Sequence, residues 1–214
     1  MFEFVLKVFT AYLLGSLLGS LIVGKLRGGI DIRKLGSGNA GGTNALRTQG
    51  VWFALGVMVI DVGKGWLAAA VLPTFPLPAA FDTNDFGLLA PWLPIACAAA
   101  VVVGHVYPLW FGFRGGKGAA TLIGVVLGLH PMAAVPTMIV WLLVLLLSGY
   151  VGLATMVAAI LFPLYALWVL HDETLLMFGI AMALFVVFTH RANISRMFAG
   201  TENRATRLWL LRPR

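Results

Sequence analysis

The sequence predicts an all-α integral membrane protein in which residues 1–214 form a single domain with seven transmembrane helices. Of the 214 residues, 60% are hydrophobic and only 11% are charged, whereas a soluble domain carries about 25% charged residues. So few charges cannot coat a globular surface. The apolar residues also gather in long runs, and the cations gather in alternate gaps between those runs, as in a multi-pass helical protein.

Three apolar runs in the first half of the chain reach the length, roughly 17–25 residues, that a helix needs to cross the hydrocarbon. They cover 4–23, 51–72 and 88–110. The first run is interpreted as a retained span, because it has little basic character before it and is followed by several similar runs. Asp61 and Lys64 lie at i, i+3 in the second run, and we expect them to form a structural ion pair, with a direct substrate contact as the alternative.

The second half of the chain is almost continuously apolar from 118 to 189 and is interrupted at three polar points. The interruptions are His130-Pro131, Ser148-Gly149-Tyr150 and His171-Asp172-Glu173. They predict four helices, at 118–130, 132–148, 151–170 and 174–189, of which the first is short for a full span. Two long helices instead of four would give the alternative of five spans.

The charges predict the orientation. Most of the 15 Lys and Arg residues lie in the gap before 51, in the gap at 114–117 and in the tail after 190, whereas acidic residues favour the other gaps, at Asp82, Asp85, Asp172 and Glu173. The positive-inside rule then places the N-terminus outside and the C-terminus in the cytoplasm. With this distribution, the net charge of +7 indicates membrane topology and contact with lipid headgroups rather than nucleic-acid binding.

The first basic segment, 35–47, has the composition of an anion-binding loop. Its four glycines allow close backbone approach, its short polar side chains offer donors, and its arginine offers a planar fork suited to phosphate. The pattern G-x-G-x-x-G occurs here, but no strand precedes it, which argues against dinucleotide binding. A flexible polar loop is the alternative. The predicted phosphate ligands are Ser37, Gly38, Asn39, Thr43, Asn44 and Arg47.

The second segment, 104–121, resembles an ATP-binding P-loop only superficially. Phe111 stands where that motif needs its first glycine, and Gly118 follows Lys117 where it needs Ser or Thr. Glycines around a lysine still favour a backbone nest for an anion. The predicted site residues are Gly115, Gly116, Lys117 and Thr121, and His105 is equally consistent with a structural or a catalytic role.

The third segment, 190–204, places His190, Asn193 and Met197 on one helical face, with Arg196 close to it. A basic helix that binds only lipid headgroups is the alternative. Because all three segments are predicted at one membrane face, we expect them to bind phosphate groups together while an acyl chain runs between helices.

The segments 36–47, 104–121 and 190–204 resemble the three signature motifs of the bacterial acyl-phosphate:glycerol-3-phosphate acyltransferase family (PlsY type), in order and spacing, over essentially the whole chain. The resemblance implies an inner-membrane enzyme with its active site on the cytoplasmic face. Such an enzyme transfers a fatty acyl group from acyl phosphate to glycerol 3-phosphate, giving lysophosphatidic acid and phosphate, the first acylation of phospholipid synthesis. One turn departs from the family pattern Ser-Arg-Tyr-Val-Ser, since it reads Ser-Gly-Tyr-Val-Gly at 148–152.

The chain's own chemistry fits this reaction. No histidine is followed by the aspartate of the His-x-x-x-x-Asp motif found in thioester-dependent acyltransferases. An acyl phosphate is already activated, so the enzyme mainly has to position two phosphorylated partners and offset their repulsion. The predicted catalytic residues are His105, Lys117, His190 and Asn193, and Arg196 joins the phosphate ligands.

Two routes for the hydroxyl proton remain open. Either His105 or His190 is a general base, or the phosphate of the donor accepts the proton; the second route is favoured because the sequence reveals no carboxylate that orients a histidine. No cofactor, metal, nucleic acid or obligate protein partner is predicted. An organic-phosphate transporter is the alternative function, although the sequence shows no internal repeat, and a scaffolding protein is a third.

Overall fold

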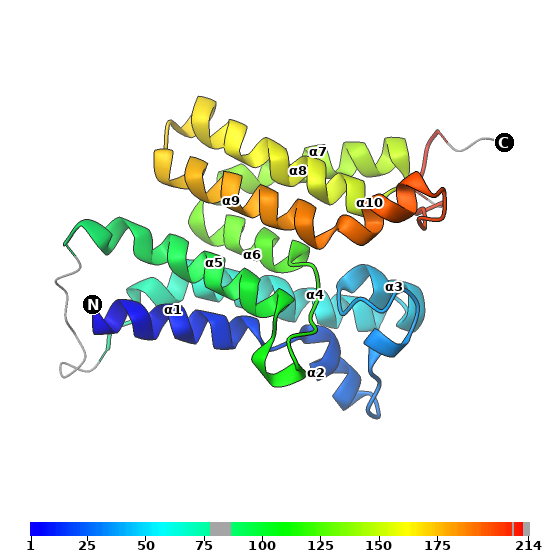
Figure 1. Cartoon of the computed structure of the whole chain (residues 1–214), viewed down its shortest axis with the longest axis horizontal. Coiled ribbons are helices and arrows are strands. Elements are labelled where there is room, and N and C mark those ends of the chain that lie inside the picture. The colour runs from blue at the N-terminus through cyan, green and yellow to red at the C-terminus, as the bar shows by residue number, and fades with distance from the viewer. Residues whose placement is uncertain (78–86, 207, 212–214) are drawn as a thin grey trace. The chain divides into compact units, whose positions relative to one another are not determined.

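The computed structural model describes residues 1–77, 87–206 and 208–211, and all regular structure within these ranges is helical (Figure 1). Several charges used for the orientation lie outside the described residues: Asp82, Asp85, Arg207, Arg212 and Arg214. The chain divides into two compact units, Met1–His130 and Pro131–Arg214.

The first unit contains six α-helices, counted among its described residues. They are α1 (Phe2–Gly15), α2 (Gly19–Leu26), α3 (Gly42–Gln49), α4 (Val51–Trp66), α5 (Leu93–Val106) and α6 (Ala119–Leu129). A π-helical turn at Leu67–Val71 and a 3-10 turn at Leu72–Thr74 extend α4. Further 3-10 turns lie at Ile32–Lys34, Gly87–Trp92 and Leu109–Phe111. Within this unit α1 packs beside α5, and α4 packs beside α6.

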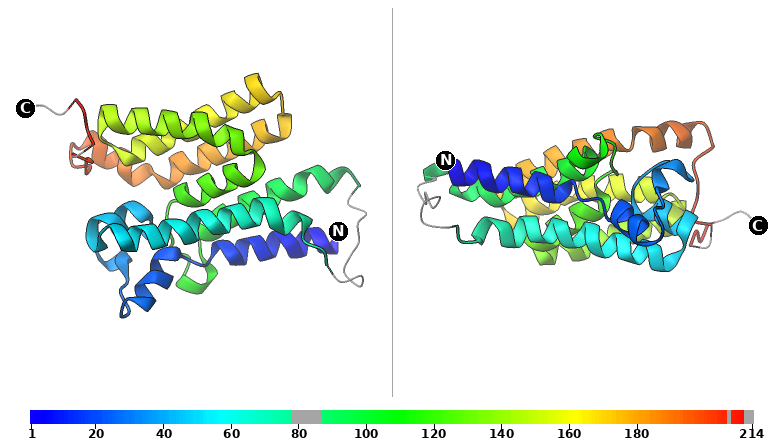
Figure 2. Two further views of the ribbon diagram at one scale, coloured as in Figure 1. Left: turned by 180° about the vertical axis from the view of Figure 1, so that it is seen from behind. Right: turned by 90° about the horizontal axis from the view of Figure 1, so that it is seen from below.

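The second unit contains α7 (Pro131–Ser148), α8 (Val151–Tyr165), α9 (Glu173–Thr189) and α10 (Arg191–Phe198), and a π-helical turn at Ala166–Leu170 extends α8. The views in Figure 2 show α7, α8 and α9 side by side, with α10 continuing from α9. Their boundaries follow local chemistry. Pro131 opens α7 at a position that needs no N–H donor. Gly149 follows α7 with a φ of 76° and donates its N–H to Leu145 O at 2.7 Å. Asp172 caps α9 by accepting from Leu175 N at 2.9 Å.

The predicted apolar runs are helical, with one correction. Four segments among the described residues are long and apolar enough to cross a membrane: Val51–Thr74, Leu89–Phe111, Pro131–Ser148 and Val151–Leu170. The run 4–23 was predicted as one helix, but α1 and α2 are bent by 48° around residues 16–18, and α9 and α10 are bent by 53°. Each bent pair passes the same test when taken together, and α6 is a shorter apolar helix, as predicted for 118–130.

Glycines on both helices bring α1 and α5 into backbone contact. A Cβ at Gly15 would collide with the Val101 carbonyl of α5, and one at Gly104 would collide with the Tyr12 carbonyl of α1. Small residues allow this close approach in membrane helices, where van der Waals packing drives association. The contact also fixes the end of α5, which leads directly into the second basic segment.

Candidate active site

The first basic segment is shaped by the side chain of Asn44, which is almost completely buried. Its Nδ2 lies 3.0 Å from each of the carbonyl oxygens of Ile32, Leu35 and Asn39, and its Oδ1 accepts from Ser37 N at 3.0 Å. These bonds fold 32–39 back onto α3. The predicted phosphate role of Asn44 stays a prediction, but its amide already has partners, so the geometry favours a positioning role.

Arg33 joins the first segment to the second. Its Nε and Nη2 donate to Asp31, while its Nη1 donates to Phe111 O at 3.2 Å and to Arg114 O at 3.0 Å. The side-chain hydrogen bond from Arg33 holds the pKa of Asp31 below its usual value of 3.8. The carboxylate therefore stays charged at neutral pH and keeps the guanidinium aimed at the second segment.

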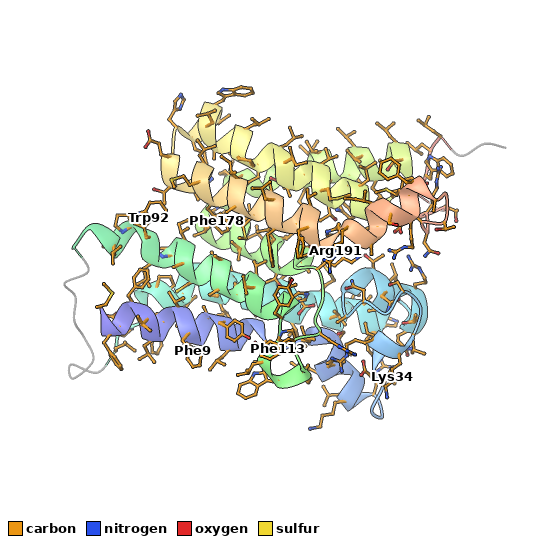
Figure 3. All side chains as sticks on the ribbon, in the orientation of Figure 1. Phe9, Lys34, Trp92, Phe113, Phe178 and Arg191 are labelled. Carbon is orange, nitrogen blue, oxygen red and sulfur yellow. The ribbon has the colours of Figure 1, made fainter. Side chains whose placement is uncertain are left out.

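A half-open cavity of about 660 Å³ lies where these two segments meet, and it is lined by Arg33, Lys34, Arg114, Gly38 and Gly115 among others. Figure 3 labels Lys34 at this end of the unit. Within the described part of the chain, neither Lys34 nor Arg114 is in an ion pair, and both side chains are exposed. Asp31 also lines the cavity and pairs with Arg33. The cavity therefore joins two glycine-rich segments and has more cations than carboxylates in its lining, which suits a phosphate group.

The glycines of the second segment are used for close approach to α5. Gly115 N donates to Val106 O and Gly116 N donates to His105 O, both at 3.1 Å, so they cap the end of α5. A Cβ at Gly116 would collide with Nε2 of His105. The anion nest predicted for these two N–H groups stays a prediction, because in this arrangement their hydrogens point at helix carbonyls.

His105 lies at a buried polar cluster with Asp61 and Lys64. The predicted ion pair between Lys64 Nζ and Asp61 Oδ1 is confirmed at 2.9 Å, and both side chains are at most 3% exposed. Lys64 also donates to Gly15 O at 2.9 Å and to Leu17 O at 2.7 Å, while Asp61 Oδ1 accepts from Gly19 N at 3.1 Å. The cation thus meets the carbonyl end of α1 and the carboxylate meets the amide end of α2, which satisfies both ends of the broken helix.

The cluster also corrects the expectation that no carboxylate accompanies a histidine. Asp61 Oδ1 lies 3.5 Å from His105 Nδ1, but Lys64 Nζ lies closer to the same nitrogen, at 2.9 Å. An ammonium group has only donors, so Nδ1 accepts and the proton of the neutral ring lies on Nε2. Lys64 has three hydrogens for four acceptors, so this hydrogen bond is shared with its carbonyl and carboxylate partners. His105 is therefore held as an Nε2–H donor rather than as the base of a Ser-His-Asp type arrangement. Sequence reasoning missed this because Asp61 and His105 lie on different helices.

His190 has the opposite tautomer. Its Nδ1 lies 2.8 Å from Val186 O, and a carbonyl can only accept, so Nδ1 carries the proton and Nε2 bears the lone pair of the neutral ring. The imidazole is buried and is oriented by the last turn of α9. Of the two predicted histidines, His190 is therefore the one whose Nε2 bears the lone pair of the neutral ring.

Glu202 ties together the other two predicted residues of the third segment. Its Oε1 accepts from Asn193 Nδ2 at 2.7 Å, and its Oε2 accepts from Arg196 Nε at 2.6 Å. The bent chain after α10 brings this carboxylate back over the helix. Sequence reasoning missed Glu202, although a single acid within a basic tail was a usable signal.

The predicted residues fall into two groups. Within Met1–His130, the first two segments meet at Arg33 and the cavity; Ser37, Thr43 and Arg47 are exposed, Asn39 and Lys117 are half-buried, and Thr121 is buried in α6. Of the predicted phosphate ligands, Gly38 and Gly115 line the cavity. Within Pro131–Arg214, His190, Asn193 and Arg196 lie on or beside α10. The joint site of all three segments stays a prediction.

Comparison with known proteins gives one consistent result. A family model described as glycerol-3-phosphate acyltransferase matches residues 5–200. Glycerol-3-phosphate acyltransferases of Chlorobaculum parvum and Chlorobaculum tepidum are 38% and 40% identical, over 96% and 95% of this chain and 98% and 97% of theirs. The crystal structure of PlsY, an integral membrane glycerol 3-phosphate acyltransferase, in its glycerol 3-phosphate form has a TM-score of 0.80 at 34% identity, covering 94% of both chains. Its lysophosphatidic acid form has a TM-score of 0.78 at 35% identity and the same coverage.

We predict that Lys64→Met destabilises the protein by about 3–5 kcal/mol, because it leaves the buried Asp61 carboxylate without its cation. It also removes the donor that fixes the His105 tautomer, so activity falls further than stability alone explains. Thermal unfolding in detergent and kcat/KM below the unfolding temperature measure the two effects.

Lys7→Met is the matched control. Lys7 forms another buried ion pair, with Glu3 at 2.7 Å, and both residues lie in α1. It should lose comparable stability and keep the kcat/KM of the folded protein. Equal losses of activity in the two variants, or an unchanged stability of Lys64→Met, would contradict the role assigned to the cluster.

Proposed function

Because this chain belongs to the glycerol-3-phosphate acyltransferase family of integral membrane proteins, we propose that it transfers a fatty acyl group from acyl phosphate to glycerol 3-phosphate. The products are lysophosphatidic acid and inorganic phosphate. The glycerol hydroxyl oxygen bonds to the acyl carbon, the bond from that carbon to the phosphate oxygen breaks, and phosphate leaves with the bonding electron pair. The step is the first acylation of phospholipid synthesis.

The cavity between the first two segments carries the proposal. It offers Lys34 and Arg114 without carboxylate partners among the described residues, beside Arg33 held by Asp31. Phosphate monoesters need such cationic donors, because their charge is otherwise costly to desolvate. We infer that glycerol 3-phosphate binds at this cavity, where Gly38 lines the first-segment side and Gly115 lines the second-segment side. The other proposed ligands of the two segments are Ser37, Asn39, Thr43, Arg47, Gly116, Lys117 and Thr121.

The side chains favour direct transfer from an activated donor over a mechanism that forms a covalent acyl-enzyme. Cys97, the only cysteine, is buried within α5, and His105 is held as a donor by Lys64. A mixed anhydride needs no enzyme nucleophile, because phosphate is already a good leaving group. The protein then contributes position and charge: Lys117 and Arg196 offset the phosphate charge, and Asn193 orients the reacting groups.

The enzyme, in this proposal, is a single domain of seven spans in the bacterial inner membrane. The four candidate spans, the two bent helix pairs and the short α6 among the described residues support this count. The N-terminus lies outside, and the C-terminus and the three basic segments face the cytoplasm, where both substrates are available. We propose no cofactor, no metal and no obligate protein partner.

For the proton, we propose the substrate-assisted route, in which an oxygen of the donor phosphate accepts it. His105 supports this route as an Nε2–H donor to the developing charge. His190, with its lone pair on Nε2, is the one alternative base that the described geometry favours.

We predict that the purified protein, given palmitoyl phosphate and glycerol 3-phosphate, releases phosphate and lysophosphatidic acid in equal amounts, and that release requires both substrates. Palmitoyl-CoA and palmitoyl-acyl carrier protein should support no turnover. Mass spectrometry of the lipid and a phosphate assay measure the result. Turnover with a thioester would refute the donor, and glycerol 3-phosphate uptake into liposomes without acylation would indicate the transporter.

We predict that His190→Ala lowers kcat without removing the acidic limb of the pH–rate profile. A general base must be deprotonated, so its loss would remove the fall in rate at low pH together with about 10²–10⁴ of the rate. Profiles of kcat for wild type, His190→Ala and His105→Ala decide between the routes. Loss of the acidic limb in His190→Ala alone would make His190 the base.

We predict that cysteines placed in the three segments react from one side of the membrane. In a Cys97→Ala background, Ser37→Cys, Arg114→Cys and Ser195→Cys use exposed positions. They should react with a membrane-impermeant maleimide in inside-out vesicles and not in spheroplasts, and Glu173→Cys should show the reverse. Reaction of any two of the three segments from opposite sides would rule out a joint site.

A further inference from the structure

The segment after α10 folds back and caps the end of α7. Ala205 N donates to Gly149 O at 2.8 Å, Trp209 Nε1 donates to Leu147 O at 3.0 Å, and Leu210 N donates to Leu146 O at 2.9 Å. The last carbonyls of a helix have no partners within it, so the docking of the described residues of this segment, 201–206 and 208–211, has a clear physical cause. We call it the C-terminal strap; Figure 2 shows it beside the end of α7.

The strap holds Arg204 between two aromatic rings. The guanidinium carbon lies 4.4 Å from the centroid of Tyr150 and 4.0 Å from that of Trp209, which fixes the plane of the side chain. Glu202, the acid nearest in sequence, is already bonded to Asn193 and Arg196. Within the described ranges, Arg204 has neither an ion pair nor a hydrogen-bond acceptor for its guanidinium, and the residue is exposed. It is an oriented cation whose five donors are available.

Gly149 gives Arg204 its position. This glycine has a φ of 76°, and a Cβ added to it would lie 3.3 Å from Arg204 Cβ and 3.1 Å from Trp209 Cγ. The strap therefore fills the place above the turn that a side chain at 149 would need. The same turn leads to Gly152, where an added Cβ would lie 3.0 Å from Asn193 Nδ2. Arg204 thus lies over the turn that packs against Asn193 of α10.

The surroundings of Arg204 suit a lipid interface. Leu208, Leu210 and Leu211 in the strap and Phe198 at the end of α10 are 50% to 90% exposed. Apolar side chains beside a cation are typical of segments that lie at the headgroup level. The anion that is abundant at the headgroup level is the phosphate of a lipid.

We propose that Arg204 is a phosphate-binding residue supplied by the C-terminal strap, and that its ligand is the phosphate group of an anionic lipid. The inference rests on the proposed function where that lipid is the acyl donor or lysophosphatidic acid; a membrane phospholipid headgroup offers the same chemistry. The planar guanidinium group, which stacks on two rings, can donate to two phosphate oxygens at once.

The test compares Arg204→Gln with wild type in binding assays that require no turnover. In neutral detergent micelles, isothermal titration calorimetry gives the Kd of lysophosphatidic acid, which we expect to rise about tenfold, as for the loss of a charge-assisted hydrogen bond. Arg204→Lys should recover part of the affinity, because it keeps the charge but loses the fork. These binding constants can be interpreted even if the protein shows no turnover with acyl phosphate.

The second arm measures thermal stability in phosphatidylcholine nanodiscs with and without phosphatidylglycerol. If Arg204→Gln weakens lysophosphatidic acid binding, the ligand is the substrate or product phosphate. If it abolishes only the stabilisation by phosphatidylglycerol, the ligand is a membrane headgroup. Arg191→Gln is the matched control, since Arg191, labelled in Figure 3, also stacks on one ring, Phe188 at 4.4 Å, and is exposed; both measurements should stay unchanged.

Hydrogen exchange at the Ala205 and Leu210 amides reports whether the strap stays docked. If both amides stay protected in Arg204→Gln and neither lipid measurement changes, the proposal is overturned. If the amides lose protection, Arg204→Lys decides. With its charge retained, it must either bind lysophosphatidic acid more tightly than Arg204→Gln or be stabilised more by phosphatidylglycerol, and equality in both measurements overturns the proposal.

Discussion

The Lys64 ammonium group is the interaction on which the arrangement of the first unit depends. It closes the carbonyl end of α1, neutralises Asp61 of its own helix and contacts His105 of α5. A buried ion pair of this kind contributes little net stability, but removing one partner is costly, since the other charge remains desolvated. The pair therefore serves to specify where the helices meet. Because the helix is broken between α1 and α2, the chain can turn toward the first basic segment. His105, near the end of α5, contacts the same cluster.

The two units use arginine in the same way. In each, one arginine is held by a carboxylate and organises the backbone: Arg33 with Asp31, and Arg196 with Glu202. In each, further cations have no carboxylate among the described residues, as with Lys34 and Arg204. The paired arginines fix geometry that a flexible loop would not keep, and in the proposed function Arg196 also faces phosphate while its Nε is bonded to Glu202. The cations outside these ion pairs add positive potential for phosphate groups. This division of labour lets glycine-rich segments bind anions without losing their shape.

The sequence predicts the helical membrane fold well, because composition and the length of apolar runs depend on local residues alone. It also predicts the pair of Asp61 and Lys64, since both lie on one helical face. It does not reveal the bend at 16–18, because the cation that satisfies the broken helix comes from α4. Contacts between distant segments were equally hidden: His105 with Asp61, Arg33 with the loop after α5, and Glu202 with α10. The three motifs identify the family, but the partner of each side chain depends on tertiary packing.

Gly116 shows how this packing affects the interpretation of substitutions at the site. Its hydrogen faces the imidazole edge of His105, so even alanine at 116 displaces a ring that Lys64 holds from the other side. In saturation mutagenesis, substitutions at position 116 would reduce activity as much as substitutions at a reacting residue, although glycine has no functional group. Loss of function on substitution of this glycine would therefore show how little the His105 ring can move. It would not be evidence that the glycine contacts a ligand.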